Sequence, residues 1–315
     1  MLGSTKRGRG MSEAMLDRAI GGTDALPVAD RSADRPASAH GPRHPRTIDA
    51  EAAIRNLPRG DLSPFQRRFR NLFSRTVAAL VIKTWFRLEV TGLERYPKGA
   101  AVLCFNHLSW LDPLLLLAAL PPKPQIYFYG PKEENLRIGK RNRFMWWTAV
   151  PVPFSPLKDD LLTSVKWVQA VFDTAGAIAI SGEGTIHVHE GDLLPFEEGP
   201  AYFALRGGVP LVPVAITGTS WVRFRGRVQV RIGEPIETGE RPTRQAIAHY
   251  RARIWHALRA MVDGDRDPEL PSRFGRWLTD IFNDWGPGGR ASVADQRGPD
   301  PADVPIPPLH ADRAE

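Results

Sequence analysis

An uninterrupted apolar run at residues 100–105 stops abruptly at the polar pair Asn106 and His107. A short apolar run of this kind predicts a buried strand. We expect a loop at Asn106, followed by a helix that runs through Leu120 and is closed by two consecutive prolines. The sequence therefore predicts a strand, a loop and a helix in immediate succession, with polar residues at the junction.

The same alternation continues along the chain. Further strands are predicted at residues 125–129, 177–180, 209–216 and 227–232, and amphipathic helices at residues 163–174 and 243–262. Strands that alternate with helices are typical of an α/β domain. We therefore predict an α/β fold over residues 91–285, with a mixed central sheet flanked by helices.

The two ends of the chain have a different composition. Residues 1–60 mix Arg, Asp, Ser, Gly and Pro without a sustained strand or helix period, and residues beyond 286 are rich in Gly, Pro and Asp. Such segments bury too little apolar area to offset the entropy of ordering. We expect a disordered basic tail at residues 1–60 and a flexible tail at residues 286–315.

Residues 61–90 predict an amphipathic helix or pair of helices that precedes the domain. Ser63 or Asp61 can cap it, with Pro64 in the first turn. Residues 61–100 carry eight basic side chains against three acidic ones. This charge favours a helix that lies on anionic lipid, and the alternative is a helix packed on the core with a solvated basic edge.

Charge and cysteine content restrict the partners and the compartment. The net charge of +7 favours an acidic partner. We expect an anionic membrane surface and no nucleic acid, because no nucleic-acid-binding motif accompanies the charge. Cys104 is the sole cysteine, and neither a signal-peptide core nor a run of eighteen apolar residues occurs. These features predict a cytoplasmic protein that is peripheral on the inner face of the membrane.

His107 and Asp112 are the leading candidates for chemistry. Attack by a hydroxyl on a thioester needs a positioned base, and histidine suits that role at neutral pH. Residues five apart in a straight helix are separated by about 500° and lie on different faces. A contact between His107 and Asp112 therefore requires a loop at His107 that turns into the helix that bears Asp112. Asn106 is expected to stabilise this turn.

Three sequence blocks resemble the glycerolipid acyltransferases, the family that includes the lysophosphatidic acid acyltransferases. Its NHxxxxD motif is intact at residues 106–112, and blocks at residues 182–201 and 208–216 follow in the family's order. The resemblance implies a glycerol-3-phosphate acyltransferase-like fold and acyl transfer from acyl-CoA or acyl carrier protein to a lysophospholipid or related lipid alcohol, without a metal or other cofactor. It also implies substrate-binding roles for Asn106, Glu183, Gly184 and Thr185.

The sequence departs from the family's pattern at two positions. Phe154 and Ile186 occupy places where the family usually has arginine. Neither side chain can make the paired charged hydrogen bonds by which arginine binds phosphate. The acceptor of this chain is therefore predicted either to lack a phosphate or to contact other cations. The nearby candidates are His187, His189, Lys132, Lys140, Arg141 and Arg143. A relative that binds lipid without turnover is the other alternative.

A serine or cysteine hydrolase is a competing hypothesis, since it too uses histidine and aspartate. No GxSxG motif surrounds Ser181. Cys104 lies within a predicted buried strand, where it is expected to act as a small apolar residue. The sequence therefore favours direct attack by the acceptor over an acyl-enzyme.

Overall fold

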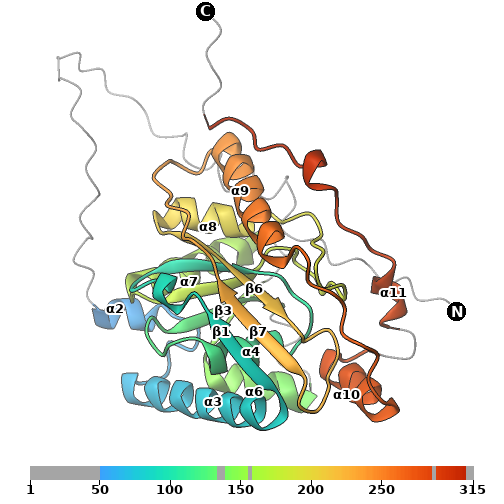
Figure 1. The fold of residues 1–315 in the computed structure, drawn as a ribbon. Coiled ribbons are helices and arrows are strands. Elements are labelled where there is room, and N and C mark those ends of the chain that lie inside the picture. The colour runs from blue at the N-terminus through green and yellow to red at the C-terminus, as the bar shows by residue number, and fades with distance from the viewer. Residues whose placement is uncertain (1–49, 133–138, 155–157, 286–288, 310–315) are drawn as a thin grey trace, which may run out of the picture.

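A seven-stranded sheet runs through the centre of the molecule (Figure 1). The computed structural model describes residues 50–132, 139–154, 158–285 and 289–309. The strands are β1 (Arg87–Thr91), β2 (Ala101–Phe105), β3 (Ile126–Lys132), β4 (Pro151–Phe154), β5 (Ala177–Ser181), β6 (Leu211–Thr217) and β7 (Arg227–Ile232). Their order across the sheet is β1-β7-β6-β2-β5-β3-β4.

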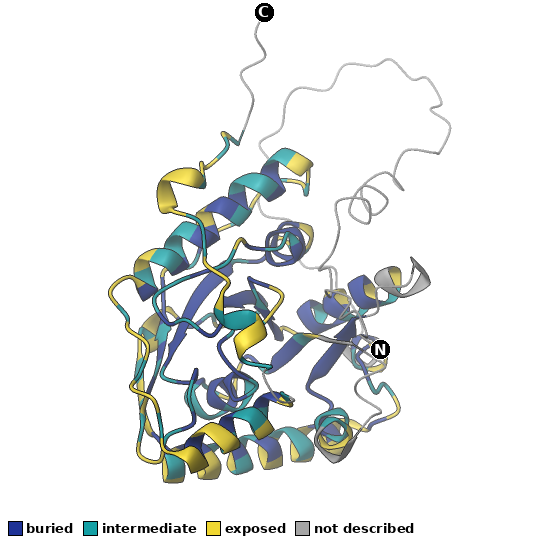
Figure 2. Cartoon of the chain, turned by 90° about the vertical axis from the view of Figure 1, so that its right-hand side faces the viewer, coloured by how far each residue is buried: buried dark blue, intermediate teal, exposed yellow. Residues whose placement is uncertain are grey.

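All neighbouring strands are parallel except β6 and β7, which are antiparallel. The sheet is therefore mixed, as predicted. Strand β2 lies between β5 and β6, and every one of its residues is buried (Figure 2). Because β2 and β5 are parallel, the segments that follow Phe105 and Ser181 leave the same edge of the sheet together.

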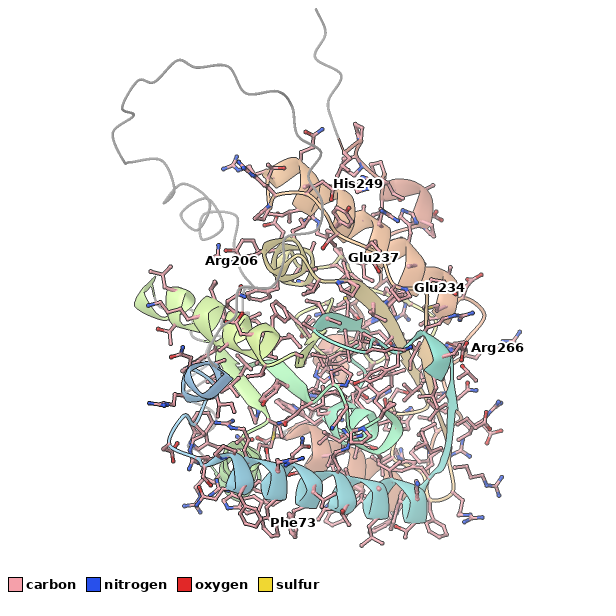
Figure 3. All side chains as sticks on the ribbon, turned by 90° about the vertical axis from the view of Figure 1, so that its left-hand side faces the viewer. Phe73, Arg206, Glu234, Glu237, His249 and Arg266 are labelled. Atoms are coloured by element: carbon pink, nitrogen blue, oxygen red, sulfur yellow. The ribbon has the colours of Figure 1, made fainter. Side chains whose placement is uncertain are left out.

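Helices α3 (Pro64–Trp85) and α4 (Asp112–Ala119) cover one face of the sheet, and α6 (Gly139–Thr148) contacts α3 and β4. Helix α3 begins at a capping box in which Ser63 and Gln66 exchange side-chain and backbone hydrogen bonds. Its buried side includes Ala78 and Ile82, which pack in the core cluster of Leu103. On its other side, Phe73 points away from the sheet (Figure 3).

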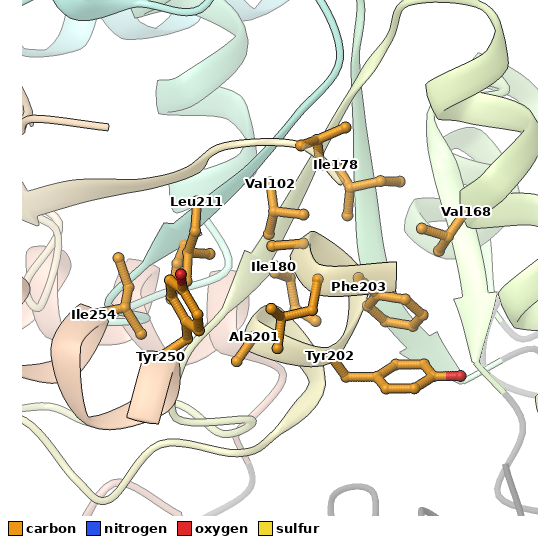
Figure 4. Close-up of a cluster of buried hydrophobic side chains, with 14 of the residues drawn as sticks. Val102, Val168, Ile178, Ile180, Ala201, Tyr202, Phe203, Leu211, Tyr250 and Ile254 are labelled. Carbon is orange, nitrogen blue, oxygen red and sulfur yellow. The ribbon is translucent and has the colours of Figure 1, made fainter. Parts of the chain in front are cut away.

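Helices α7 (Lys158–Asp173), α8 (Gly199–Gly207) and α9 (Arg244–Val262) cover the opposite face. Alternate β2 residues Val102 and Cys104 point into this second core cluster, in agreement with the two-residue period of a strand. The cluster also contains Tyr202 and Phe203 of α8 and Ile254 of α9 (Figure 4). The sheet thus lies between two helical layers, each with its own apolar core.

Two segments near the N-terminus differ from expectation. Residues 87–90, predicted to end a helix, belong to β1, which pairs with β7. Helix α2 (Ala50–Arg55) and the buried side chain of Leu57 lie within the predicted tail, because Leu57 joins the core cluster of α7 and α8. The rest of the predicted N-terminal tail, residues 1–49, lies outside the described residues.

The C-terminal segment also differs from expectation. After α10 (Arg273–Asn283), residues 289–309, here called the C-terminal strap, include α11 (Ala291–Ala294) and a 3-10 turn (Pro301–Asp303). The carbonyls of Val304 and Pro307 accept hydrogen bonds from His256 and His249 of α9, at 2.6 and 2.7 Å. These contacts from a distant helix order a segment whose composition predicts flexibility.

Another 3-10 turn (Leu93–Arg95) follows β1. Within the described parts of the chain, no helix combines the length and the apolar character needed to cross a membrane.

Candidate active site

The loop between β2 and α4 (residues 106–111, the β2–α4 loop) brings His107 to Asp112. Helix α4 begins at Asp112, so the two residues lie on either side of the loop-to-helix boundary. The His107 Nδ1 and Asp112 Oδ2 atoms are 2.8 Å apart. The contact predicted from the sequence is present, and it arises from the predicted change of direction at the start of the helix.

The Asp112 carboxylate is completely buried and its two oxygens are fully engaged. Oδ2 also accepts hydrogen bonds from the backbone N–H groups of Leu108 and Ser109, at 2.8 and 2.9 Å. Oδ1 accepts one from the Thr219 hydroxyl, at 2.6 Å. Four donors around one carboxylate fix its orientation. Asp112 is therefore a rigid acceptor for the His107 ring.

The His107 ring lies near the surface, with 15% of its side chain exposed. Its edge-on neighbours are the rings of Phe105 and Trp110, with centroids 5.8 and 6.2 Å away. Since the carboxylate can only accept, Nδ1 carries the hydrogen in this contact. The lone pair of the neutral imidazole is then on Nε2, which has no hydrogen-bond partner among the described residues. This is the arrangement of a general base.

The turn after β5 (residues 182–187, the β5 turn) holds the backbone of the β2–α4 loop. The His187 N–H donates to the His107 carbonyl at 2.7 Å, and the Gly182 N–H donates to the Phe105 carbonyl at 2.9 Å. Gly184 adopts a left-handed conformation with φ of 65°. Gly184 and Thr185 are exposed, and their predicted contact with an acceptor stays a prediction.

Glu183 has a different position from the one expected of a substrate contact. Its carboxylate is inaccessible to solvent and accepts hydrogen bonds from the backbone N–H groups of His107 and Leu194, at 3.3 and 3.4 Å. Burial raises the pKa of Glu183 well above its usual range. Glu183 therefore holds the loop through its backbone, and its predicted contact with the acceptor stays a prediction.

His187 packs beside Glu183 inside the protein. Burial lowers the pKa of His187, and its Nδ1 lies 3.5 Å from Glu183 Oε2. Because burial favours the uncharged form of each group, we regard this contact as one between neutral side chains and not as an ion pair. The His187 Nε2 atom lies 3.3 Å from the carbonyl of Gln296 in the C-terminal strap. His187 is consequently unavailable to bind an acceptor phosphate.

Asn106 is also a positioning residue. Its side-chain amide donates to the Ile216 carbonyl at 2.9 Å and accepts from the Ile216 N–H at 2.7 Å. Both polar atoms of the amide are thereby used, and the residue is buried. Asn106 stabilises the turn, as expected, by tying the end of β2 to β6. The additional prediction that Asn106 binds substrate stays a prediction, and a buried side chain bonded to Ile216 at both polar atoms does not favour it.

Residues 218–220 (the Gly218 loop) complete the support of Asp112. The buried Glu190 carboxylate accepts hydrogen bonds from the Gly218 N–H at 2.6 Å and the Ser220 hydroxyl at 2.5 Å. Burial raises the pKa of Glu190. From the C-terminal strap, Arg290 donates to the Ser220 carbonyl at 2.7 Å. The loop that presents the Thr219 hydroxyl is thus held from two sides, and no sequence pattern near His107 indicates it.

Asn283, at the end of α10, contacts the β2–α4 loop directly. Its Oδ1 atom accepts a hydrogen bond from the Trp110 N–H at 2.9 Å and one from the Ser109 hydroxyl at 3.2 Å. The sequence separation of more than 170 residues explains why no local motif could reveal this contact. Helix α10 therefore belongs to the structure that fixes His107.

Neither Phe154 nor Ile186, which occupy the positions of the family's arginines, has a charged side chain. Phe154 is buried and packs against the Tyr129 ring, with centroids 5.9 Å apart. Ile186 is half-buried in the β5 turn. Of the candidate substitutes, His189 contacts Asp267 at 2.9 Å, whereas Arg143 is exposed on α6. Further candidates, the side chains of Lys132, Lys140 and Arg141, lie outside the described residues.

Cys104 lies wholly inside β2, and burial raises the pKa of its thiol. A protonated, inaccessible thiol is a poor nucleophile. The structure supports the expectation that this cysteine is a packing residue.

Comparison with known proteins agrees with the site. The acyltransferase family matches residues 87–217. The 1-acyl-sn-glycerol-3-phosphate acyltransferase of Saccharomyces cerevisiae is 27% identical over 179 residues, which cover 53% of this chain and 57% of that protein. The alpha form of the same enzyme from Bos taurus is 29% identical over 161 residues, which cover 48% of this chain and 55% of that protein.

Among solved structures, the 1-acyl-sn-glycerophosphate acyltransferase PlsC from Thermotoga maritima is similar with a TM-score of 0.48 and 20% identity, over 62% of this chain and 78% of that one. The chain spans a little over half the length of the curated relatives it matches. The matched residues include the β2–α4 loop with His107, the first residue of α4, Asp112, and the β5 turn. Over residues 87–217, the chain is therefore similar to the acyltransferase family.

Proposed function

We propose that this protein transfers a fatty acyl group from acyl-CoA or acyl carrier protein to the hydroxyl of a lysophospholipid or related lipid alcohol. The observation that carries the proposal is the 2.8 Å contact between His107 Nδ1 and a completely buried Asp112. A carboxylate held by three other donors keeps the imidazole in one tautomer and one orientation. His107 is the general base, and Asp112 is the residue that orients it.

The proposed reaction is a direct displacement. The acceptor hydroxyl gives its proton to His107 Nε2 while its oxygen bonds to the carbonyl carbon of the thioester. Asp112 stabilises the resulting imidazolium through Nδ1. The carbon–sulfur bond then breaks and the proton passes to the departing thiolate, so the products are an ester and a free thiol. No covalent acyl-enzyme is needed, in keeping with the buried Cys104.

Phe154 and Ile186 suggest a second hypothesis about the acceptor, which concerns whether it carries a phosphate. A buried aromatic side chain and an isoleucine provide no charged hydrogen bond for a phosphate. His187 and His189 already have protein partners. This arrangement favours an acceptor whose phosphate is absent or is bound elsewhere. The curated relatives named above carry 1-acyl-sn-glycerol-3-phosphate in their names, so both acceptor classes belong in the test.

We further propose that α3 attaches the protein to an anionic membrane surface, the peripheral location predicted from the sequence. Its exposed apolar side chains support this, and they include Phe65, Phe69 and Leu72. The support from charge is smaller than the sequence indicated. Arg67, Arg70 and Arg75 donate to backbone carbonyls of the protein, which leaves Arg68 and Lys83 as the exposed cations of this helix.

Acyl transfer can be tested with purified protein, radiolabelled acyl-CoA, and a panel of lysophospholipids and non-phosphorylated alcohols, with products identified by mass spectrometry. We expect ester formation by the wild type and a rate about 10²- to 10⁴-fold lower for His107→Ala. The control is Gln169→Ala, since Gln169 is exposed on α7 and contacts only Asp173 of the same helix among the described hydrogen bonds. Undiminished transfer by His107→Ala would contradict the general-base role.

A further inference from the structure

Helix α10 has its apolar and polar faces reversed relative to an ordinary surface helix. Phe274, Trp277 and Ile281 form one stripe, which Leu270 extends just before the helix. All four side chains are more than half exposed: Phe274 by 58%, Trp277 by 56%, Ile281 by 51% and Leu270 by 72%. The spacing of three and four residues places Phe274, Trp277 and Ile281 on one side of the helix. Below, this set is called the α10 stripe.

The side of α10 that faces the protein is small and polar. Its buried residues are Gly275, Thr279 and Asn283. The Thr279 hydroxyl accepts a hydrogen bond from the Val222 N–H at 2.9 Å, and Asn283 accepts those from the β2–α4 loop. Half-buried Leu278 and Phe282 add apolar packing at the edge. Hydrogen bonds thus fix the orientation of α10 and prevent it from turning its stripe inward.

Exposed side chains of this size are costly in water when they form a contiguous group, and such groups mark sites of contact with another surface. We propose that α10 is a lipid-surface helix whose stripe inserts into the headgroup region of an anionic membrane. The rings of Phe274 and Trp277 contact each other, with centroids 5.5 Å apart. Aromatic side chains of this kind are favoured at the depth of the headgroups.

Charge beside the stripe points to an anionic lipid surface as the occupant. Arg273 and Arg276 are exposed on α10 next to Phe274 and Trp277. Exposed Arg225 adjoins the exposed Phe224 in the connection before β7. Arginines that flank an apolar stripe attract phospholipid phosphates, whereas a purely apolar protein partner gives no reason for them.

The α10 stripe is also continuous with the exposed side of α3. A cleft of about 440 Å³ between the two helices is lined by Trp85 at the end of α3, by Phe224, and by Leu270 and Phe274. The Trp85 and Phe224 rings contact each other at 5.2 Å. Both helices lie on the same lower side of the molecule in Figure 1. One lipid surface can therefore contact both helices at once.

This inference extends the proposed function and rests on it in one respect. Because Asn283 of α10 binds the backbone of Trp110, a helix lying on lipid would hold the β2–α4 loop, and with it His107, close to that surface. A lipid acceptor would then reach the base without leaving the headgroup region. Binding of α10 to lipid itself needs no acyl transfer, so the two proposals can fail separately.

The test is partition of the full chain into vesicles of equal parts phosphatidylglycerol and phosphatidylcholine, measured by co-sedimentation. We expect the double variant Phe274→Ser with Trp277→Ser to lower the partition coefficient at least about tenfold, since both side chains are large and exposed. The matched control is Leu162→Ser, because Leu162 is equally exposed on α7, on the opposite face of the sheet. Wild-type partition by the double variant would overturn the proposal.

A second variant tests the charge argument. Arg273→Gln with Arg276→Gln is expected to weaken binding to the anionic vesicles severalfold and to leave binding to pure phosphatidylcholine vesicles unchanged. Equal loss on both vesicles, or none on either, would contradict an anionic surface as the occupant. Should the wild type instead sediment as a dimer that only the stripe variants dissociate, with vesicle binding unaltered, a second copy of the chain would be the occupant and the proposal would be wrong.

Acyl-transfer rates separate this proposal from the proposed function. If the wild type is active, the stripe variant should show a lower ratio of activity on vesicle-embedded acceptor to activity on a short-chain acceptor dispersed as monomers. An unchanged ratio would count against α10. If the wild type proves inactive on every acceptor, the proposed function fails, and the vesicle partition result still decides the role of α10.

Discussion

The β2–α4 loop and the β5 turn leave the sheet side by side, and they use their polar side chains in opposite ways. In the β2–α4 loop, the His107 ring reaches the surface while the carboxylate behind it is buried. In the β5 turn, the Glu183 carboxylate points inward to the backbone of His107, and the exposed part is Gly184 and Thr185. One segment presents a polar side chain at the surface, and the other supports its backbone.

This difference shows that a short motif does not assign one role to all its residues. Both segments lie within the stretch that matches the family, yet the polar side chain that reaches the surface differs from those that hold the backbone in place. Substitutions in the β2–α4 loop should therefore act on rate, and those at Glu183 should act mainly on stability. The following experiments are ordered by the size of the expected effect.

The largest effect is expected for Asp112→Asn. The Asp112 carboxylate now accepts hydrogen bonds from three N–H groups and one hydroxyl. An asparagine would present an NH2 group, itself a donor, to some of these donors, so the His107 ring would lose its fixed tautomer and orientation. We expect acyl transfer to fall about 10³- to 10⁴-fold. The measurement is single-turnover transfer from radiolabelled acyl-CoA. Asp173→Asn in α7 is the control. If Asp112→Asn lowered the acyl-transfer rate by less than tenfold, the proposed difference between the β2–α4 loop and the β5 turn would be wrong.

An intermediate effect is expected for Thr219→Val. The substitution keeps the shape and removes the 2.6 Å hydrogen bond to the buried Asp112 carboxylate. We expect kcat to fall about tenfold with KM little changed, because a hydrogen bond to a charged group is worth about 1.5–3 kcal/mol and part of it is recovered by relaxation. Thr219→Ser should restore the rate, and Thr84→Val on α3 should have no effect. A rate that serine does not restore would remove Thr219 from the positioning network.

The smallest effect on rate is expected for Glu183, where stability is the better measurement. Since burial raises the pKa of Glu183, the folded state prefers the neutral carboxyl, and its contribution to stability is lost as pH rises from the unfolded value of 4.5 through the folded value. Glu183→Gln removes this loss. We expect its Tm to equal or exceed that of the wild type at about pH 8, with the difference vanishing toward acid pH.

Glu183→Ala is the contrasting variant. It leaves the N–H groups of His107 and Leu194 without an acceptor, which should lower the free energy of unfolding by about 1–3 kcal/mol. A glutamine variant as unstable as the alanine variant would show that the charge of Glu183, and not its hydrogen-bonding geometry, supports the loop. Denaturant unfolding of the two variants at one pH measures the difference.

The sequence predicted those parts of the fold that local pattern determines. The apolar run before Asn106 became β2, and the requirement for a loop between His107 and Asp112 was met at the start of α4. Residues 87–90 of β1 continue the apolar pattern of α3, so the sequence alone favours a helix there. Only pairing with β7, some 140 residues away in the chain, makes them a strand.

The supporting residues of the site could not be predicted for the same reason. Thr219 and Asn283 carry ordinary side chains at positions without a motif, and they reach the β2–α4 loop only because β6 and α10 end beside it. The strap likewise has a composition typical of a flexible tail. Its order depends on hydrogen bonds from His249 and His256, which face it from another helix.

The Gly218 loop lies just outside the segment that matches the acyltransferase family. The segment that matches the acyltransferase family ends at residue 217, two residues before Thr219. A fragment of that length would contain His107 and Asp112 without the hydroxyl that fixes Asp112. It would also contain β1 without β7, the strand through which β1 joins the sheet. The stretch that matches the family is therefore smaller than the set of segments that complete the sheet and hold Asp112, which includes β7, Thr219 and Arg290.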